Sequence, residues 1–148
     1  MCNKVGQRPA NESVSLGTPS VASTAKTAGM AVKGIGIDLC EIARMQALLD
    51  EGRSLRRMFT EDEQAYIAGK GASAAQTMAG MFAAKEAVLK ALGTGMSIPM
   101  TDIVISHTAL GQPVATLTGK AAQSGGTVLV SITHEGGMAA AFAVWTKA

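Results

Sequence analysis

The segment FAAKEAVLKALGTG, residues 82–95, places a carboxylate and an ammonium on one face of a helix. Glu86 and Lys90 are four residues apart and so lie about one turn apart, whereas Lys85 is rotated by roughly 100° from Glu86. Either Glu86 and Lys90 form a solvated ion pair worth a few tenths of a kcal/mol, or they face one ligand. The apolar neighbours leave little room for a solvated face. The Gly93-Thr94-Gly95 loop could also direct backbone N–H groups at an anion.

Asp38 follows the apolar run VKGIGI and is the second candidate for chemistry. An aspartate at the end of a strand is a favoured N-cap for the next helix. Alternatively it binds a hard cation, since Mg²⁺ is held by one or two carboxylates with phosphate oxygens and water. If the strand and the helix pack together, Asp38 and Glu86 form such a pair and Lys90 faces the same phosphate. That arrangement suits phosphoryl transfer, in which metal and ammonium stabilise developing negative charge.

Other polar residues carry weaker signals. His134 ends the run VSITH before a glycine turn, where it is either structural or functional, and His107 has no comparable context and is assigned to the surface. Ser131 has no nucleophile-elbow sequence around it, and GIGID lacks the third glycine of a dinucleotide fingerprint. Four arginines form either a solvated helix face or a docking patch for an acidic partner. They are Arg44, Arg53, Arg56 and Arg57.

Apolar periodicity and turn residues predict an α+β domain with a small antiparallel sheet packed on a long helix. Helices are predicted for 41–52, for a segment that begins at the Thr60/Glu63 capping box, and for about 73–92, which Gly93 ends. Gly111-Gln112-Pro113 predicts a turn, and Glu135-Gly136-Gly137 predicts a hairpin. The predicted strands are 32–39, 101–108, 127–134 and 138–145.

The composition is that of one globular domain with few aromatic residues. Of 148 residues, 47% are hydrophobic but only 3% are aromatic, so aliphatic residues and nine Met must fill the core. Such a thin core favours stabilisation by oligomerisation. The net charge of +2 argues against general nucleic-acid binding. Cys2 and Cys40 match neither a metal site nor a disulfide framework, which predicts a cytoplasmic location. No apolar run approaches the roughly 18 residues of a membrane span.

Residues 1–31 differ in composition from the domain predicted for residues 32–148. They are rich in Ser, Thr, Ala and Gly and contain a single acid, Glu12, which predicts a disordered extension. A transit peptide, or an overextended start with Met30 as the true first residue, are the alternatives. The single arginine, Arg8, weakens the transit interpretation. Without residues 1–31, ten basic and ten acidic residues remain, so the domain is formally neutral.

Four fragments, taken in order, resemble the holo-(acyl-carrier-protein) synthases of the 4′-phosphopantetheinyl transferase superfamily. They are GIGIDLCEIARM, MAGMFAAKEAVLKALGTG, DIVI followed by GQP, and VSITH followed by AAAFAV. The resemblance covers about residues 33–146, and F-x-x-K-E-x-x-x-K with the upstream G-I-D is its specific part. It implies an enzyme of fatty acid biosynthesis that transfers 4′-phosphopantetheine from coenzyme A to a serine of apo-acyl carrier protein, leaving adenosine 3′,5′-bisphosphate. Family members of this size are trimers with sites at subunit interfaces, so a homotrimer is expected.

The resemblance also implies roles for individual residues. Asp38 and Glu86 correspond to the Mg²⁺ ligands, and Lys90 to a lysine that contacts the phosphate and assists the leaving group. Arg44 matches a basic residue that meets the acidic recognition helix of the carrier protein. The residues expected to contact coenzyme A are Lys90, Gly93, Thr94, Gly95 and His134.

Three features depart from the family pattern. Family members commonly carry Arg where this chain has Met81, so one anion contact is lost or supplied elsewhere. The segment between Leu117 and Thr127 is shorter than usual, which puts the helix expected there in question, and the N-terminal tail has no counterpart. Two other classes of function therefore stay open. One is a non-catalytic module that binds coenzyme A or carrier protein, and the other is a structural oligomerisation domain.

Overall fold

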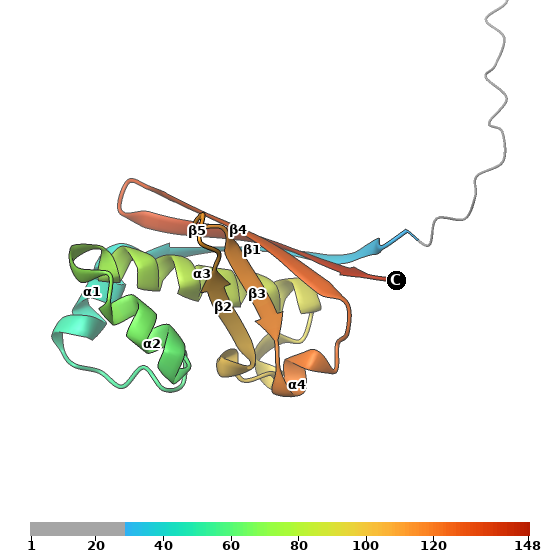
Figure 1. Ribbon diagram of the computed structural model, residues 1–148, viewed down its shortest axis with the longest axis horizontal. Helices are drawn as coiled ribbons and strands as arrows, with labels where there is room; N and C mark the ends of the chain where they lie inside the picture. The colour runs from blue at the N-terminus through green and yellow to red at the C-terminus, as the bar shows by residue number, and fades with distance from the viewer. Residues whose placement is uncertain (1–28) are drawn as a thin grey trace, which may run out of the picture.

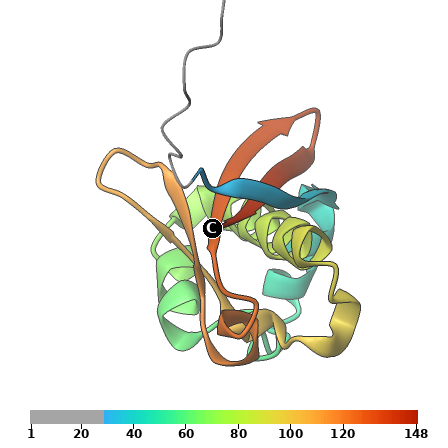
Figure 2. The ribbon, with the colours of Figure 1, turned by 90° about the vertical axis from the view of Figure 1, so that its right-hand side faces the viewer.

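Helix α3 (Ala74–Leu92) runs through the middle of the structure, and most other elements pack against it. The computed structural model describes residues 29–148. A three-stranded sheet covers one side of α3, and a two-stranded sheet and helix α2 lie against other sides (Figure 1, Figure 2). The predicted α+β class is confirmed, with two small antiparallel sheets in place of one. The extension predicted for residues 1–31 lies outside the described residues, apart from its last three positions.

One strand is present that the sequence does not predict. The strand β3 follows the predicted turn at 111–113 and pairs with β2 from Ile103 opposite Leu117 to His107 opposite Pro113. The short segment after β3 retains a helix of four residues, α4. The longer helices and the other strands lie in the predicted regions, whereas the sequence does not predict the three short 3-10 helices η1, η2 and η3. In chain order the elements are β1 (Ala31–Glu41), α1 (Ile42–Asp50), α2 (Glu61–Ala68), η1 (Gly71–Ser73), α3, η2 (Gly95–Ser97), η3 (Met100–Asp102), β2 (Ile103–His107), β3 (Pro113–Leu117), α4 (Gly119–Ala122), β4 (Thr127–Glu135) and β5 (Met138–Lys147).

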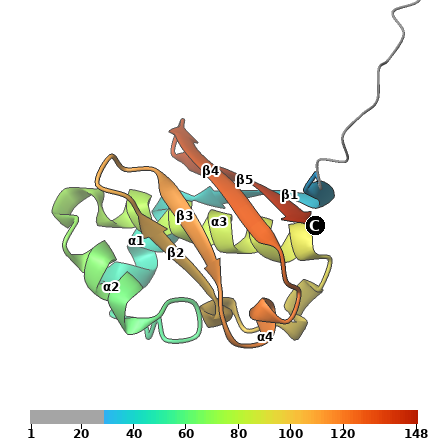
Figure 3. The ribbon, with the colours of Figure 1, turned by 45° about the vertical axis from the view of Figure 1, so that its right-hand side comes forward.

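The topology of the three-stranded sheet separates two of the candidate residues. Its strand order is β1-β5-β4, whereas β2 and β3 form their own sheet, which crosses in front of α3 in Figure 3. In this register Asp38 of β1 lies opposite Ala141, and His134 of β4 lies opposite Ala139. The strand β5 therefore stands between Asp38 and His134.

The strand β1 turns a glycine, not its isoleucines, toward α3. A Cβ on Gly36 would overlap the carbonyl oxygen of Ala87, so the strand backbone lies directly on the helix. The side chains of Ile35 and Ile37 point away and are 62% and 63% exposed. Because side chains alternate along a strand, the face that holds Gly36 continues to Asp38. The predicted alternation is present, and the helix packs on its glycine side.

The helix α3 contributes mainly small side chains to this contact. Ala79 and Ala83 are completely buried. Phe59 is the one aromatic side chain among residues 29–148 that is fully buried, and Met45 and Met78 fill the core beside it. No helix in the same part of the chain combines the length and the apolar character needed to cross a membrane.

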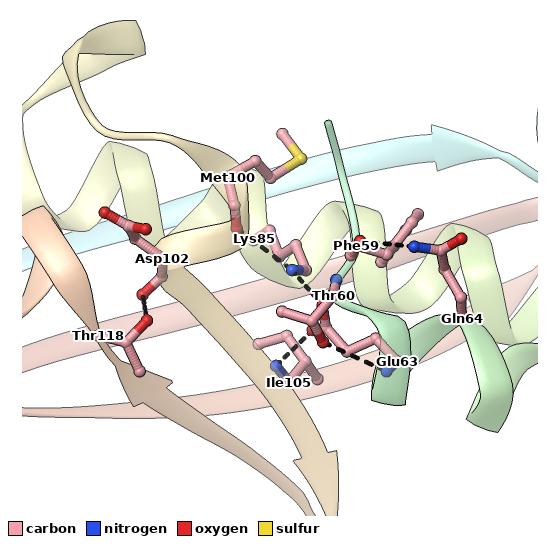
Figure 4. A network of polar contacts seen from close by, with 9 residues as sticks. All are labelled: Phe59, Thr60, Glu63, Gln64, Lys85, Met100, Asp102, Ile105 and Thr118. Carbon is pink, nitrogen blue, oxygen red and sulfur yellow. Dashed lines mark hydrogen bonds and ion pairs between the residues drawn. The ribbon is translucent and has the colours of Figure 1, made fainter. Parts of the chain in front are cut away.

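A buried ion pair ties α2 to α3 and to β2 (Figure 4). Lys85 Nζ donates to Glu63 Oε2 at 2.7 Å and to the carbonyl oxygen of Met100 at 3.2 Å. Glu63 also completes the predicted capping box with Thr60, and its Oε1 accepts the N–H of Ile105 at 2.7 Å. Burial lowers the pKa of Lys85, and the hydrogen bond to Glu63 opposes that shift. Lys85 is therefore a structural residue of the F-x-x-K-E segment.

The contact between β1 and α3 is tested by Gly36→Ala. The added methyl group must displace either the strand or the helix, so we expect the free energy of unfolding to fall by about 1–3 kcal/mol. Gly69→Ala is the matched control, because Gly69 has φ −68° and its Cβ would meet its nearest neighbour at 3.5 Å. The control should be neutral or stabilising by about 0.4–1 kcal/mol. Urea unfolding at one protein concentration measures both, and equal stabilities would contradict the close contact.

The buried ion pair is tested by Lys85→Met. This change leaves the Glu63 carboxylate buried without its cation, so we expect the free energy of unfolding to fall by about 3–5 kcal/mol. Lys120→Met, at an exposed lysine of α4, should stay within about 0.5 kcal/mol of the wild type. Urea unfolding again provides the measurement. A Lys85→Met variant as stable as the Lys120→Met control would show that the pair does not hold these elements together.

Candidate functional site

Asp38 and Lys90 meet where β1 lies against the C-terminal half of α3. Lys90 Nζ donates to Asp38 Oδ1 at 2.7 Å and to the carbonyl oxygen of Ile37 at 2.9 Å. The Asp38 side chain is 17% exposed and that of Lys90 is 52% exposed, so the ammonium also reaches solvent. Asp38 is not the N-cap of α1, because β1 continues to Glu41, which takes that position without a side-chain hydrogen bond. The capping alternative drawn from the sequence is therefore wrong.

Glu86 is half-buried and interacts with the same charged groups. Burial raises the pKa of its carboxyl, and the Asp38 carboxylate raises that pKa further, whereas Lys90 and Arg44 lower it. The structure thus brings Asp38, Glu86 and Lys90 together. No ion pair between Glu86 and Lys90 forms in the described part of the chain, because Lys90 pairs with Asp38 instead. The interpretation of Glu86 and Lys90 as a simple ion pair along the helix is therefore also wrong.

Asp38 and Glu86 supply two oxygen ligands of the kind that hard divalent cations prefer. Their carboxylates repel each other, and a cation bound by both would remove that repulsion. Mg²⁺ usually takes one or two carboxylates and completes its coordination with water and substrate phosphate oxygens. Residues 29–148 contain no group of three or more His, Cys, Asp or Glu side chains that could hold a metal. A metal bound here would therefore take its remaining ligands from outside the chain.

The loop that follows α3 lies next to Lys90. Gly93 ends the helix with φ 67°, and its N–H donates to the carbonyl oxygen of Lys90 at 3.1 Å. Gly95 has φ 56°, a left-handed conformation that glycine adopts without strain. Between them, the hydroxyl oxygen of Thr94 is buried and has no hydrogen-bond partner within residues 29–148. Buried hydroxyl groups normally have a partner, so Thr94 is a candidate contact for a ligand at this loop.

A cavity of about 450 Å³ lies beside Glu86 and combines basic and apolar side chains. Arg44 and Arg57 line it, and the guanidinium of Arg44 is 5.7 Å from the centre of the Phe82 ring. The other lining residues are Met58, Leu89, Met96, Ile98, Pro99 and Met100. The surface next to Glu86 therefore suits a partner that is both acidic and apolar.

His134 lies at a different surface of α3 from Glu86. Its imidazole packs against Gly80, where an added Cβ would lie 3.0 Å from Nε2. It lines a second cavity of about 190 Å³, which shares no lining residue with the cavity beside Glu86. Within one chain, the structure does not join His134 to Asp38, Glu86 and Lys90.

The second cavity also contains residues that the sequence does not single out. His107, assigned to the surface from the sequence, is half-buried there, and its ring stacks on Tyr66 with the centroids 4.9 Å apart. Lys70 Nζ lies 4.2 Å from the centre of the same Tyr66 ring. These residues come from segments that meet only in the fold, so no local spacing connects them. The turn predicted at 111–113 is the one sequence feature that pointed to this cavity, because Gly111 and Pro113 line it.

Comparison with known proteins identifies the family. A model described as the 4′-phosphopantetheinyl transferase superfamily matches residues 34–143. The holo-(acyl-carrier-protein) synthase of Treponema denticola is 38% identical over 119 residues, covering 76% of this chain and 97% of the relative. That of Protochlamydia amoebophila is 43% identical over 120 residues, covering 77% and 98%. The crystal structure of a holo-(acyl-carrier-protein) synthase from Bacillus anthracis in complex with CoA (3′,5′-ADP) is similar, with a TM-score of 0.68 and 33% identity, covering 81% of this chain and 100% of the other. This chain belongs to the 4′-phosphopantetheinyl transferase superfamily.

Proposed function

We propose that this chain transfers the 4′-phosphopantetheine group of coenzyme A to a serine of apo-acyl carrier protein, giving holo-acyl carrier protein and adenosine 3′,5′-bisphosphate. The group formed by Asp38, Glu86 and Lys90 carries this proposal, in a chain that covers nearly the whole length of relatives named holo-(acyl-carrier-protein) synthase. The serine oxygen bonds to the phosphorus that carries pantetheine. The bond from that phosphorus to the bridging oxygen of the pyrophosphate breaks, and the serine proton is released. We assign the reaction to fatty acid biosynthesis in the cytoplasm.

Asp38 and Glu86 would hold Mg²⁺, which supplies positive charge at the pyrophosphate of coenzyme A when it is bound. Lys90 already donates hydrogen bonds to Asp38 and to the carbonyl oxygen of Ile37. An ammonium has three donor protons, so the third proton of this half-exposed side chain remains for a phosphate oxygen. We assign Lys90 to stabilising the charge on the leaving phosphate, together with the loop at Gly93–Gly95.

Arg44 is proposed to contact the acyl carrier protein. It is exposed on α1 and, with Arg57, lines the apolar cavity beside Glu86. Two guanidinium groups would steer an acidic partner to this surface and set its register, and the apolar wall around Phe82 would accept its hydrophobic side chains. A serine delivered by a partner docked here would arrive next to the carboxylates.

The outward face of the three-stranded sheet supports the proposal of a homotrimer. Phe142 lies opposite Ile37, so the exposed large side chains of neighbouring strands share one face. Soluble monomers rarely expose large contiguous apolar patches, and further copies of this chain are the occupants that we propose for this one. His134 gives separate support, because a coenzyme A site that uses both His134 and Glu86 would have to be shared between two copies. The exposed apolar residues of this face are Ile35, Ile37, Leu39, Leu129 and Phe142.

The intact mass of the carrier protein tests the proposed function. Incubation of the full chain with coenzyme A, Mg²⁺ and apo-acyl carrier protein should add the mass of one phosphopantetheine group to the carrier. Glu86→Gln should slow this transfer by more than about 100-fold, because a carboxylate ligand is lost. Glu51→Gln is the matched control, because Glu51 is exposed beyond the end of α1, and it should keep the wild-type rate.

The outcomes of this assay separate the three classes of function. No gain in mass with retained binding of coenzyme A would contradict the proposal and leave a non-catalytic binding module, of which Met81, at a position where the resembled family commonly carries Arg, would be the mark. Loss of both transfer and binding would leave a structural oligomerisation domain. A wild-type rate in Glu86→Gln would contradict the role assigned to Glu86.

A further inference from the structure

A third cavity, of about 290 Å³, opens between the two sheets at the end of the molecule where α4 lies. The strand β3 and the start of β4 form its walls, and within residues 29–148 each of these strands pairs on one side only. None of the described residues in the wall is charged, so this cavity, named here the α4 cavity, suits an uncharged and apolar occupant. The lining residues are Ala115, Thr116, Leu117, Ala122, Gly125, Gly126, Thr127 and Val128.

The loop that follows α4 fixes one side of the α4 cavity against β5. The indole N–H of Trp145 donates to the carbonyl oxygen of Gly125 at 2.8 Å. Gly126 has φ 78°, and a Cβ there would overlap the carbonyl oxygen of Thr146. The loop therefore lies directly on the backbone of β5, and the cavity is preformed for whatever enters it.

The start of β1 lies at the same end of the sheet as the α4 cavity (Figure 3). Ala31 of β1 lies opposite Lys147 of β5, and Lys147 Nζ donates to the carbonyl oxygen of Ser124 at 3.2 Å. Because neighbouring strands are about 4.8 Å apart, the distance from β1 across β5 to β4 is about 10 Å. About four extended residues cover that distance. The chain that precedes β1 can therefore reach the cavity.

The sequence before β1 contains a stretch that matches the chemistry of the cavity. Residues 13–23, SVSLGTPSVAS, contain no charged side chain, and Leu16 is the largest apolar one among them. The seven residues 24–30 connect this stretch to β1, which is more than the crossing requires. Its composition predicts disorder for the segment by itself, and segments of this kind become ordered when they dock on a folded surface.

Two departures from the family pattern fall at this one place. The family model matches from residue 34 onward, so the N-terminal residues lie outside it. The segment between Leu117 and Thr127 is shorter than in the resembled family, and its helix α4 has only four residues. The short segment leaves a space beside β3, and the additional residues before β1 supply side chains that can fill it.

We propose that residues 13–23 of this chain dock on the α4 cavity and that the side chain of Leu16 fills it. The contact removes apolar surface of Leu117 and Val128 from water, which stabilises the docked segment. The short connection to β1 holds the segment at a high effective concentration, so a small apolar contact is sufficient. The N-terminal segment then acts as a strap that closes the gap between β3 and β4. This inference is independent of the proposed transfer reaction.

NMR on the full chain with labelled Leu and Val methyl groups tests the contact directly. We expect nuclear Overhauser effects from the methyl groups of Leu16 to those of Leu117 or Val128. Samples mixed from differently labelled copies separate contacts within one chain from contacts between chains. The proposal would be overturned by the absence of these effects. It would also be overturned if they occurred only between copies, because the occupant would then be the segment of a neighbouring chain.

Amide hydrogen exchange provides an independent measurement. The N–H groups of Ser124 and Gly125 donate to carbonyl oxygens of α4 at 3.1 Å, beside the cavity. Leu16→Asp should speed their exchange by about 10-fold or more, because the loop loses a buried leucine that stabilises its closed state. Leu16→Ile should keep the wild-type rate. Val5→Asp is the matched control, since it adds the same charge outside the docked stretch, and it should also keep that rate. Unchanged exchange in Leu16→Asp, or an equal increase in Val5→Asp, would contradict the proposal.

Discussion

The direct contact between the backbone of β1 and helix α3 is the constraint on which the candidate site depends. A Cβ on Gly36 would overlap the carbonyl oxygen of Ala87, and one on Gly34 would overlap that of Ala91. The strand therefore runs antiparallel to the helix at a distance that only glycine permits. Asp38 follows on the same strand face, and this contact turns its carboxylate toward the helix. The spacing in the run GIGID thus fixes both the packing and the position of the acid.

The same contact determines what faces α3 and what faces outward. It sets the carboxylates of Asp38 and Glu86 near each other, and the half-exposed side chain of Lys90 pairs with Asp38. It also turns the isoleucines of β1 away from the core. The sequence indicated that the two acids would pair if strand and helix packed together, and the structure meets that condition. The bond from Lys90 to Asp38 was not predictable, since the spacing of four residues pointed to Glu86 as its partner.

Local patterns predicted the elements well and the contacts between them poorly. The capping box at the start of α2 is confirmed because both of its hydrogen bonds are local. The other bonds of Glu63, to Lys85 and Ile105, join residues that are 22 and 42 positions apart, and no periodicity indicates them. His107 was assigned to the surface for the same reason, since the ring that covers it, Tyr66, belongs to another element. The strand β3 has only a turn signal before it and became recognisable through its pairing with β2.

We propose that the contact of β1 with α3 makes Asp38 and Glu86 a single metal site. Calorimetric titration of Mg²⁺ into the protein saturated with coenzyme A tests it most directly. We expect one Mg²⁺ site in the wild type, with an affinity that falls by more than about 10-fold in Asp38→Asn and in Glu86→Gln and is unchanged in the exposed control Glu51→Gln. Wild-type Mg²⁺ affinity in either Asp38→Asn or Glu86→Gln would contradict the claim.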